Sequence, residues 1–192
     1  MVVGRPSLKE QLVERTFGVW LDRGFEGASV NDLVVAAGVP KGSFYNHFSS
    51  KETFAVAHVQ RYVQGLELDA LRTAEGPALE AIRQHFNHQL LARRAANLEP
   101  GCLLGTFSTG VSAAYPELLA AVRDGFAQWI DALAQVISRG QDRGEITGDL
   151  DSGDIAAALV DGLQGALARA RITGESRPFE VFLSTTMETL CR

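Results

Sequence analysis

A short run of polar side chains between residues 41 and 51 has the clearest capacity for chemistry in this sequence. These side chains can hydrogen-bond to phosphates or to the edges of bases: Lys41, Ser43, Tyr45, Asn46 and His47. Phe44 and Phe48 are four residues apart, so on a helix they share a face that can anchor it inward. Tyr45 and Asn46 then project the other way. The DNA major groove admits one α-helix, so an exposed helix with such donors is suited to reading DNA.

The elements around these residues form a helix, a tight turn and a second helix over residues 29–48. Ser29, with Asp32 three residues later, begins the first helix, and Gly38 ends it at the corner. Pro40 can open the short second helix, which we expect to reach about Phe48. Lys51 follows in the first turn of the next helix, where its ammonium and the helix terminus together could clamp a phosphate. A plain helical hairpin is the alternative interpretation of this segment.

The remaining sequence also predicts helices, so the expected fold class is all-α. A capping box at residues 7–10 opens a helix that ends at Gly24, and Gly76-Pro77 ends the long helix that begins near Lys51. Further helices are expected from Leu79, after Tyr115-Pro116, after Asp151 and from Pro178. The residues that begin and end these helices divide the chain into a small N-terminal domain, residues 1–50, and a larger helical domain, residues 51–192.

Composition is that of an ordinary globular protein, with 46% hydrophobic and 21% charged residues among 192. The sequence contains no apolar run long enough for a membrane span and no secretory signal, so we expect a cytoplasmic protein without membrane contact. The net charge of −5 argues weakly against nucleic-acid binding. Residues 1–51, however, hold six Lys/Arg, five Asp/Glu and all three lysines, a small asymmetry of the sign that DNA binding needs.

Other chemically capable residues give weaker patterns. Cys102 and Cys191 form neither a disulfide framework nor a metal-ligand spacing. His85 and His88 could share a helix face, but no supporting ligand is spaced in the same helix, so neither a metal nor a cofactor is expected. The pair Arg93-Arg94 could meet an anionic effector, or could simply be solvated. No nucleophile with a base and no phosphate loop is evident, so an enzyme is not expected, although Cys102 with one of the histidines is the conceivable pair.

The segment from about Leu8 to Phe54 closely resembles the DNA-binding domain of TetR-type repressors. The order and spacing of several short matches carry this resemblance: Gly24-Phe25, Ser29-Val30, Asp32-Leu33, Ala37-Gly38-Val39, Lys41-Gly42-Ser43-Phe44-Tyr45, His47-Phe48 and Lys51-Glu52. The family's fold is a helix-turn-helix domain joined to a C-terminal domain that binds an effector and dimerises.

The resemblance implies a ligand-responsive repressor that binds double-stranded operator DNA in the cytoplasm. It implies that Lys41, Tyr45, His47 and Lys51 contact phosphates, and that Ser43 and Asn46 lie near bases. Ser29 and Gly42, in the same matched segment, complete the set of DNA-binding candidates. Pro40 departs from the family pattern, which often has a capping Ser or Thr there.

The stretch Gly101-Cys102-Leu103-Leu104-Gly105 resembles NemR-type relatives, which respond to electrophiles and oxidants through a cysteine. Pro100-Gly101 would place the Cys102 thiol at a helix N-terminus, which favours the thiolate. Cys102 is therefore the redox or electrophile candidate, with a buried apolar thiol as the alternative. No lysine follows Lys51, so a sensor that joins this cysteine to a lysine is not available.

The two C-terminal helices are rich in apolar and small residues at helical spacing, which favours pairing with the same helices of a second copy. An internally buried helix pair is the alternative. A homodimer would place two reading helices about one DNA turn or somewhat more apart, so the operator should be palindromic. The predicted interface residues are Ile155, Ala158, Leu159, Gly162, Leu163, Ala166, Phe179, Phe182, Leu183 and Leu190.

Overall fold

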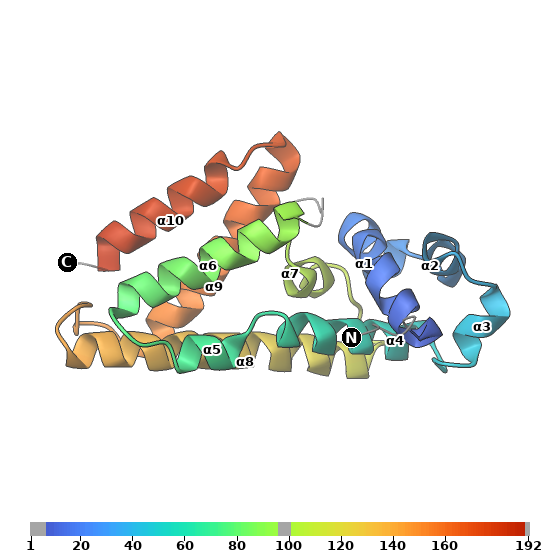
Figure 1. Ribbon diagram of the computed structural model, residues 1–192, viewed down its shortest axis with the longest axis horizontal. Coiled ribbons are helices and arrows are strands. Elements are labelled where there is room, and N and C mark those ends of the chain that lie inside the picture. The colour runs from blue at the N-terminus through green and yellow to red at the C-terminus, as the bar shows by residue number, and fades with distance from the viewer. Residues whose placement is uncertain (1–6, 96–100, 191–192) are drawn as a thin grey trace, which may run out of the picture. The chain divides into compact units, whose positions relative to one another are not determined.

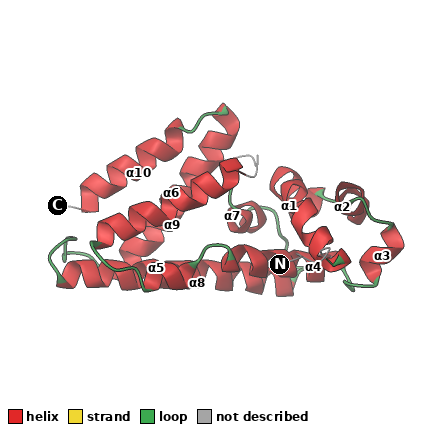
Figure 2. Cartoon of the chain, in the orientation of Figure 1, coloured by secondary structure: helices red, strands yellow, loops and turns green. Residues whose placement is uncertain are grey.

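The computed structural model describes residues 7–95 and 101–190, without the side chains of residues 92–95. Helices joined by turns make up these residues, and none of them lies in a strand (Figure 2). The predicted all-α fold is confirmed. No helix in the described ranges is long and apolar enough to cross a membrane. The helices are α1 (Leu8–Gly27), α2 (Val30–Ala37), α3 (Lys41–Tyr45), α4 (Lys51–Gln64), α5 (Leu68–Arg72), α6 (Ala78–Ala95), α7 (Leu103–Ser108), α8 (Pro116–Asp142), α9 (Ser152–Thr173) and α10 (Arg177–Leu190).

Packing divides the chain into two compact units. The first unit contains the described residues up to Tyr62 together with Leu103–Arg123. The second unit contains the described residues from Val63 to Cys102 and those from Asp124 onward. The first unit thus contains α7 and the start of α8, although these lie far from α1–α4 in the sequence. The predicted boundary after residue 50 separates the expected DNA-binding domain from the expected effector-binding domain, and it stays a prediction. The boundary between the two packed units falls later, after Tyr62.

Capping residues fix the starts of α1 and α2 where the sequence predicts them, whereas α1 runs past its predicted end at Gly24 to Gly27, with a kink at Gly24 where φ is 65°. The Glu10 backbone N–H donates to Ser7 Oγ at 3.2 Å, and the Ser7 N–H donates back to Glu10 Oε2 at 2.7 Å. Ser29 and Asp32 form the second capping box at the start of α2. The hydrogen bond from the Ser29 side chain, followed by that from its backbone, lowers the pKa of the Asp32 carboxyl. These hydrogen bonds therefore favour the ionised carboxylate of Asp32.

Aromatic rings form the core of the first unit and explain why residues from α7 belong to it. Trp20 of α1 and Phe107 of α7 are both fully buried, with ring centroids 5.5 Å apart in an edge-to-face arrangement. Phe25 packs against Tyr115, just before α8, at 4.6 Å. Such pairs add to the free energy gained by burying the rings. The rings of Phe107 and Tyr115 therefore hold the segment Leu103–Arg123 to α1.

The second unit is built on the C-terminal part of α8, with α6, α9 and α10 (Figure 1). Trp129 of α8 and Phe86 of α6 are fully buried at its centre. Phe86 also meets Phe182 of α10, with centroids 5.7 Å apart. Near the end of α8, a Cβ added at Gly140 would lie 2.7 Å from the Ala78 Cβ and 2.8 Å from Ile146 Cδ1. Gly140 lies within α8, and this close approach leaves no room for a side chain there.

One break in the structure differs from the sequence prediction. The helix expected to run from Lys51 to Gly76-Pro77 is interrupted between α4 and α5, where Glu67 has a left-handed backbone with φ of 53°. Leu66 and Leu68 flank it, and both are buried. Residues two apart point to nearly opposite sides of a continuous helix. The break allows both leucines to enter the core.

Candidate nucleic-acid interface

The corner between α2 and α3 is a sharp turn made by Gly38. Gly38 has φ of 70° and ψ of 35°, a left-handed conformation that glycine adopts without strain. Its backbone N–H donates to the carbonyls of Val34 and Val35, and the Arg15 guanidinium donates to the Ala37 carbonyl at 3.2 Å. The last backbone carbonyls of α2 therefore have hydrogen-bond donors. These hydrogen bonds, rather than a flexible loop, set the direction of α3.

Helix α3 is anchored by aromatic side chains on its inner face. Phe44 is fully buried and Phe48 is 3% exposed. Their ring centroids lie 5.2 Å and 4.6 Å from that of Phe54 on α4. The predicted inward face is thus confirmed, although regular helix ends at Tyr45 rather than near Phe48. Backbone N–H groups of His47 and Phe48 still donate to the Phe44 carbonyl, so the chain keeps a helical turn beyond α3.

The outer face of α3 carries most of the DNA-binding candidates. Tyr45 is 54% exposed, and four other candidates are also exposed: Lys41, Gly42, Asn46 and His47. Ser43 is half-buried. Lys41 makes no hydrogen bond or ion pair to any described residue, so its ammonium is available to a phosphate. These residues form a polar surface over a rigid aromatic base.

Ser29 and Lys51, the other two candidates, are already engaged within the first unit. The Ser29 hydroxyl donates to Asp32 Oδ2 at 2.6 Å. Lys51 Nζ donates to the Phe25 carbonyl at 2.9 Å and the Ala28 carbonyl at 3.2 Å, and it lies 4.3 Å from the centroid of the Phe25 ring. These bonds cap the carbonyl end of α1. A phosphate contact by Lys51 stays a prediction, and it would use the remaining ammonium hydrogen.

Two residues around the site have roles that the sequence did not reveal. Arg15 holds the helix-turn-helix corner, as described above. Glu52 is next to Lys51, and its Oε1 accepts hydrogen bonds from the backbone N–H groups of Glu117 at 2.9 Å and Leu118 at 3.2 Å. It thereby caps the start of α8 in the same unit. Partners 65 and 66 residues away leave no local pattern in the sequence.

Several nearby basic side chains are paired with acidic ones. Arg23 lies 2.7 Å from Asp32, and Arg61 lies 3.1 Å from Glu14. Arg23 and Arg61 are therefore less available to phosphates than unpaired basic side chains would be. Lys9 lies over the Phe48 ring at 5.7 Å and is exposed, which adds a second lysine near α3. The local electrostatics favour contact with phosphates chiefly through Lys41 and Lys9.

Cys102 directly precedes α7 and is 3% exposed, so access by a reagent from solution is small. Its role as an electrophile sensor stays a prediction. Cys191 lies outside the described residues, as do the side chains of Arg93 and Arg94. No group of three or more His, Cys, Asp or Glu side chains in the described ranges could hold a metal ion.

Comparison with known proteins places this site in a known class. The sequence model described as "Bacterial regulatory proteins, tetR family" matches residues 9–57, and "Tetracyclin repressor-like, C-terminal domain" matches residues 78–186. The HTH-type transcriptional repressor DhaR of Mycobacterium sp. (strain GP1) is 34% identical over 98% of this chain and 94% of that protein.

Similarity extends to NemR and to solved structures of the same fold. The HTH-type transcriptional repressor NemR of Escherichia coli (strain K12) is 28% identical over 90% of this chain and 88% of its own. The crystal structure of reduced E. coli NemR has a TM-score of 0.79 at 29% identity, covering 93% of this chain and 94% of that one. A regulatory protein TetR from Rhodobacter sphaeroides has a TM-score of 0.86 at 26% identity, covering 95% and 99%.

The exposed polar helix beyond a glycine corner, together with these matches, identifies a helix-turn-helix transcriptional regulator. The chain belongs to the TetR family. The resemblance inferred from residues 8–54 is therefore confirmed, and so is the similarity to NemR.

Proposed function

We propose that this regulator is a repressor that binds a palindromic operator as a homodimer and is released by a small-molecule effector. Its relatives DhaR and NemR are both named as repressors. The observation that carries the proposal is the division of α3 into two faces. Phe44 and Phe48 fix the inner face, which leaves Lys41, Tyr45 and Asn46 exposed on a rigid support.

Within this proposal, the exposed residues have separate tasks. Lys41, Tyr45, His47 and Lys51 would contact phosphates, which positions the helix without reading sequence. Asn46 is exposed at the end of α3 and can pair with both the N6 and N7 atoms of an adenine. Ser43 is half-buried and would approach bases only at close range.

Asn46→Ala tests this assignment. Bound sequences selected from random duplexes should show a weaker preference at one position of each half-site, worth about 1–3 kcal/mol, because a bidentate pair is lost. Asn31→Ala, on the exposed side of α2, is the matched control and should keep the wild-type motif. An unchanged motif for Asn46→Ala would show that Asn46 reads no base.

The homodimer would use the exposed side of α9 and α10. Six of the predicted interface residues are already buried inside the chain: Ile155, Leu159, Leu163, Ala166, Phe179 and Leu190. Ala158 and Gly162 are exposed, while Phe182 and Leu183 are half-buried. A groove of about 320 Å³ between the two helices is lined by Leu150, Ala158 and Thr185, among others. An apolar groove beside small exposed residues supports pairing of α9 and α10 with a second copy.

Gly162 also has a role within one chain. A Cβ there would lie 2.9 Å from Phe182 Cε2, so Gly162 allows α10 to pack closely on α9. A large substitution at Gly162 would disturb that packing as well as any dimer. Gly165, one turn further on, is exposed and has open space around it, so it reports on the dimer alone.

A further inference from the structure

A small pocket in the second unit lies between α5 and α6. Its volume is about 200 Å³, and it opens to solvent, since Glu67, Ala70, Gln84 and His88 of its lining are exposed. Alanine and leucine side chains form most of its lining, including Ala70 of α5 and Ala81 of α6. The polar lining residues are Glu67, Gln84, His85 and His88. A compact ligand with an apolar body would fit this space.

His85 gives the pocket one hydrogen-bond donor in a fixed position. The ring is 8% exposed, and the Trp129 indole N–H donates to its Nε2 at 2.8 Å. An indole N–H can only donate, so Nε2 carries no proton and Nδ1 carries the proton of the neutral ring. Burial, with a smaller contribution from His88, lowers the pKa of His85 to about 4, so the ring is uncharged at neutral pH. The Nδ1–H has no partner among the described residues.

The one carboxylate among the pocket-lining residues disfavours anions. The Glu67 carboxylate lines the pocket, and Oε2 lies 3.7 Å from His88 Nδ1. A negatively charged ligand would be repelled by this carboxylate. A ligand without an acceptor would exclude water from the Nδ1–H of His85 and leave it without a hydrogen-bond partner.

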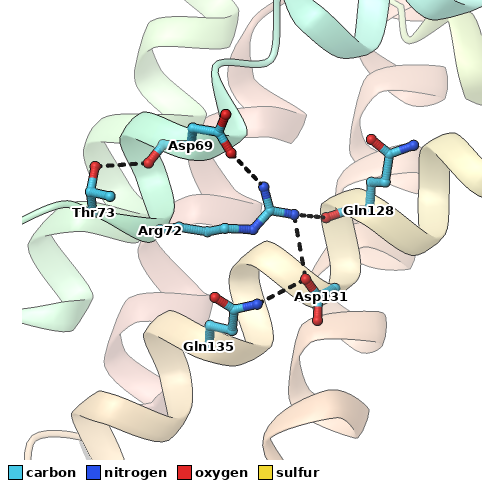
Figure 3. A network of polar contacts seen from close by, with 6 residues as sticks. All are labelled: Asp69, Arg72, Thr73, Gln128, Asp131 and Gln135. Atoms are coloured by element: carbon cyan, nitrogen blue, oxygen red, sulfur yellow. Dashed lines mark hydrogen bonds and ion pairs between the residues drawn. The ribbon is translucent and has the colours of Figure 1, made fainter.

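Both walls of the pocket are attached to one turn of α8. Arg72, at the end of α5, donates to the Gln128 carbonyl at 3.3 Å and to Asp131 Oδ2 at 3.4 Å, while also bonding Asp69 at 2.9 Å (Figure 3). Trp129, between these two partners, holds His85 on α6. A ligand that separates α5 from α6 must therefore strain contacts to a single turn of α8.

We propose that this pocket binds a small uncharged molecule with an apolar body and one hydrogen-bond acceptor, which receives the Nδ1–H of His85. The molecule is the effector of this regulator, an assignment that rests on the proposed repressor function. Leu66 and Glu67 line the pocket and form the break that directly follows α4. Occupancy therefore acts on the segment through which the chain leaves the DNA-binding unit.

The test uses the full chain and three six-membered-ring probes: cyclohexanone, cyclohexene and cyclohexanecarboxylate. The reporter is the indole N–H signal of Trp129 in ¹H–¹⁵N spectra. The chain has two tryptophans, and Trp20→Phe or Trp129→Phe assigns the signals. Cyclohexanone should shift the Trp129 signal saturably, and the other two probes should bind at least tenfold more weakly.

Ala70→Phe, which fills the pocket from α5, should abolish the shift, whereas Ala127→Phe, at an exposed position of α8, should leave it intact. A shift that survives Ala70→Phe, no shift with cyclohexanone, or equal binding of the carboxylate would overturn the pocket assignment. The same cyclohexanone concentrations should weaken duplex binding by the wild type and not by Ala70→Phe. Occupancy without such weakening would overturn the effector role. Failure of the ligand-free protein to bind DNA would instead refute the repressor function.

Discussion

At the scale of single residues, two lysines of the first unit have opposite surroundings. Lys41 is exposed and makes no polar contact with any described residue, whereas Lys51 donates to the carbonyls of Phe25 and Ala28. The sequence shows both as basic residues near a helix start. Only the fold brings the end of α1 to Lys51, because its partners are 26 and 23 residues away.

Lys51→Met should destabilise the protein by about 1–3 kcal/mol, because it keeps most of the side chain's apolar length but removes the charged donor from two carbonyls. Lys41→Met is the matched control and should stay within about 0.5 kcal/mol of the wild type, since Lys41 is exposed. Urea denaturation measures both. Equal stabilities of the two variants would mean that the Lys51 hydrogen bonds contribute nothing.

At the scale of helices, capping residues made several helix starts predictable. Ser7, Ser29 and Asp151 cap helices where the sequence indicated, because each cap is formed within three residues of the helix start. The break at Glu67 was not predictable, since its cause is the burial of Leu66 and Leu68 against other helices. The placement of α7 in the first unit depends on Phe107 meeting Trp20, which no local pattern encodes.

The proposed pairing of α9 and α10 with a second copy leads to a prediction at this scale. Gly165→Arg should dissociate the dimer and weaken operator binding at least tenfold, because a charged side chain would enter the apolar interface. The substitution replaces a helix-interior glycine, so it should not weaken α9 itself.

Sedimentation equilibrium gives the mass of each variant, and Ala127→Arg on α8 serves as the control that stays dimeric. A dimeric Gly165→Arg protein with full operator affinity would place the interface elsewhere.

At the scale of the whole molecule, each unit contains a buried neutral histidine. His58 Nε2 lies 3.0 Å from Thr16 Oγ1, whose own hydrogen is donated to the Leu12 carbonyl. Burial, with a smaller effect of Arg61, lowers the pKa of His58 to about 3, and burial lowers that of His85 to about 4. Both rings are uncharged in the folded protein at pH values where the unfolded chain already takes up protons.

Stability should therefore fall as the pH falls below about 6.5. The two neutral histidines contribute their full stabilisation at pH values above the pKa of histidine in the unfolded chain. This contribution is lost as the pH falls toward their pKa values in the folded protein, about 4 for His85 and about 3 for His58. Between pH 6 and 5 the slope should approach 2–3 kcal/mol per pH unit for two histidines, at about 1.4 kcal/mol per proton. Denaturation at fixed protein concentration measures this slope. His85→Gln, which keeps an acceptor for Trp129, should roughly halve it, and an unchanged slope would exclude His85.

DNA binding by α3 is the central claim, and the salt dependence of duplex binding tests it most directly. The wild type should lose affinity linearly with the logarithm of salt concentration, because phosphate contacts release counterions. Lys41→Met should reduce that slope by about one unit per protomer, or about two for a dimer on its operator. An affinity that is insensitive to salt, or the same slope in Lys41→Met and wild type, would contradict this account of α3.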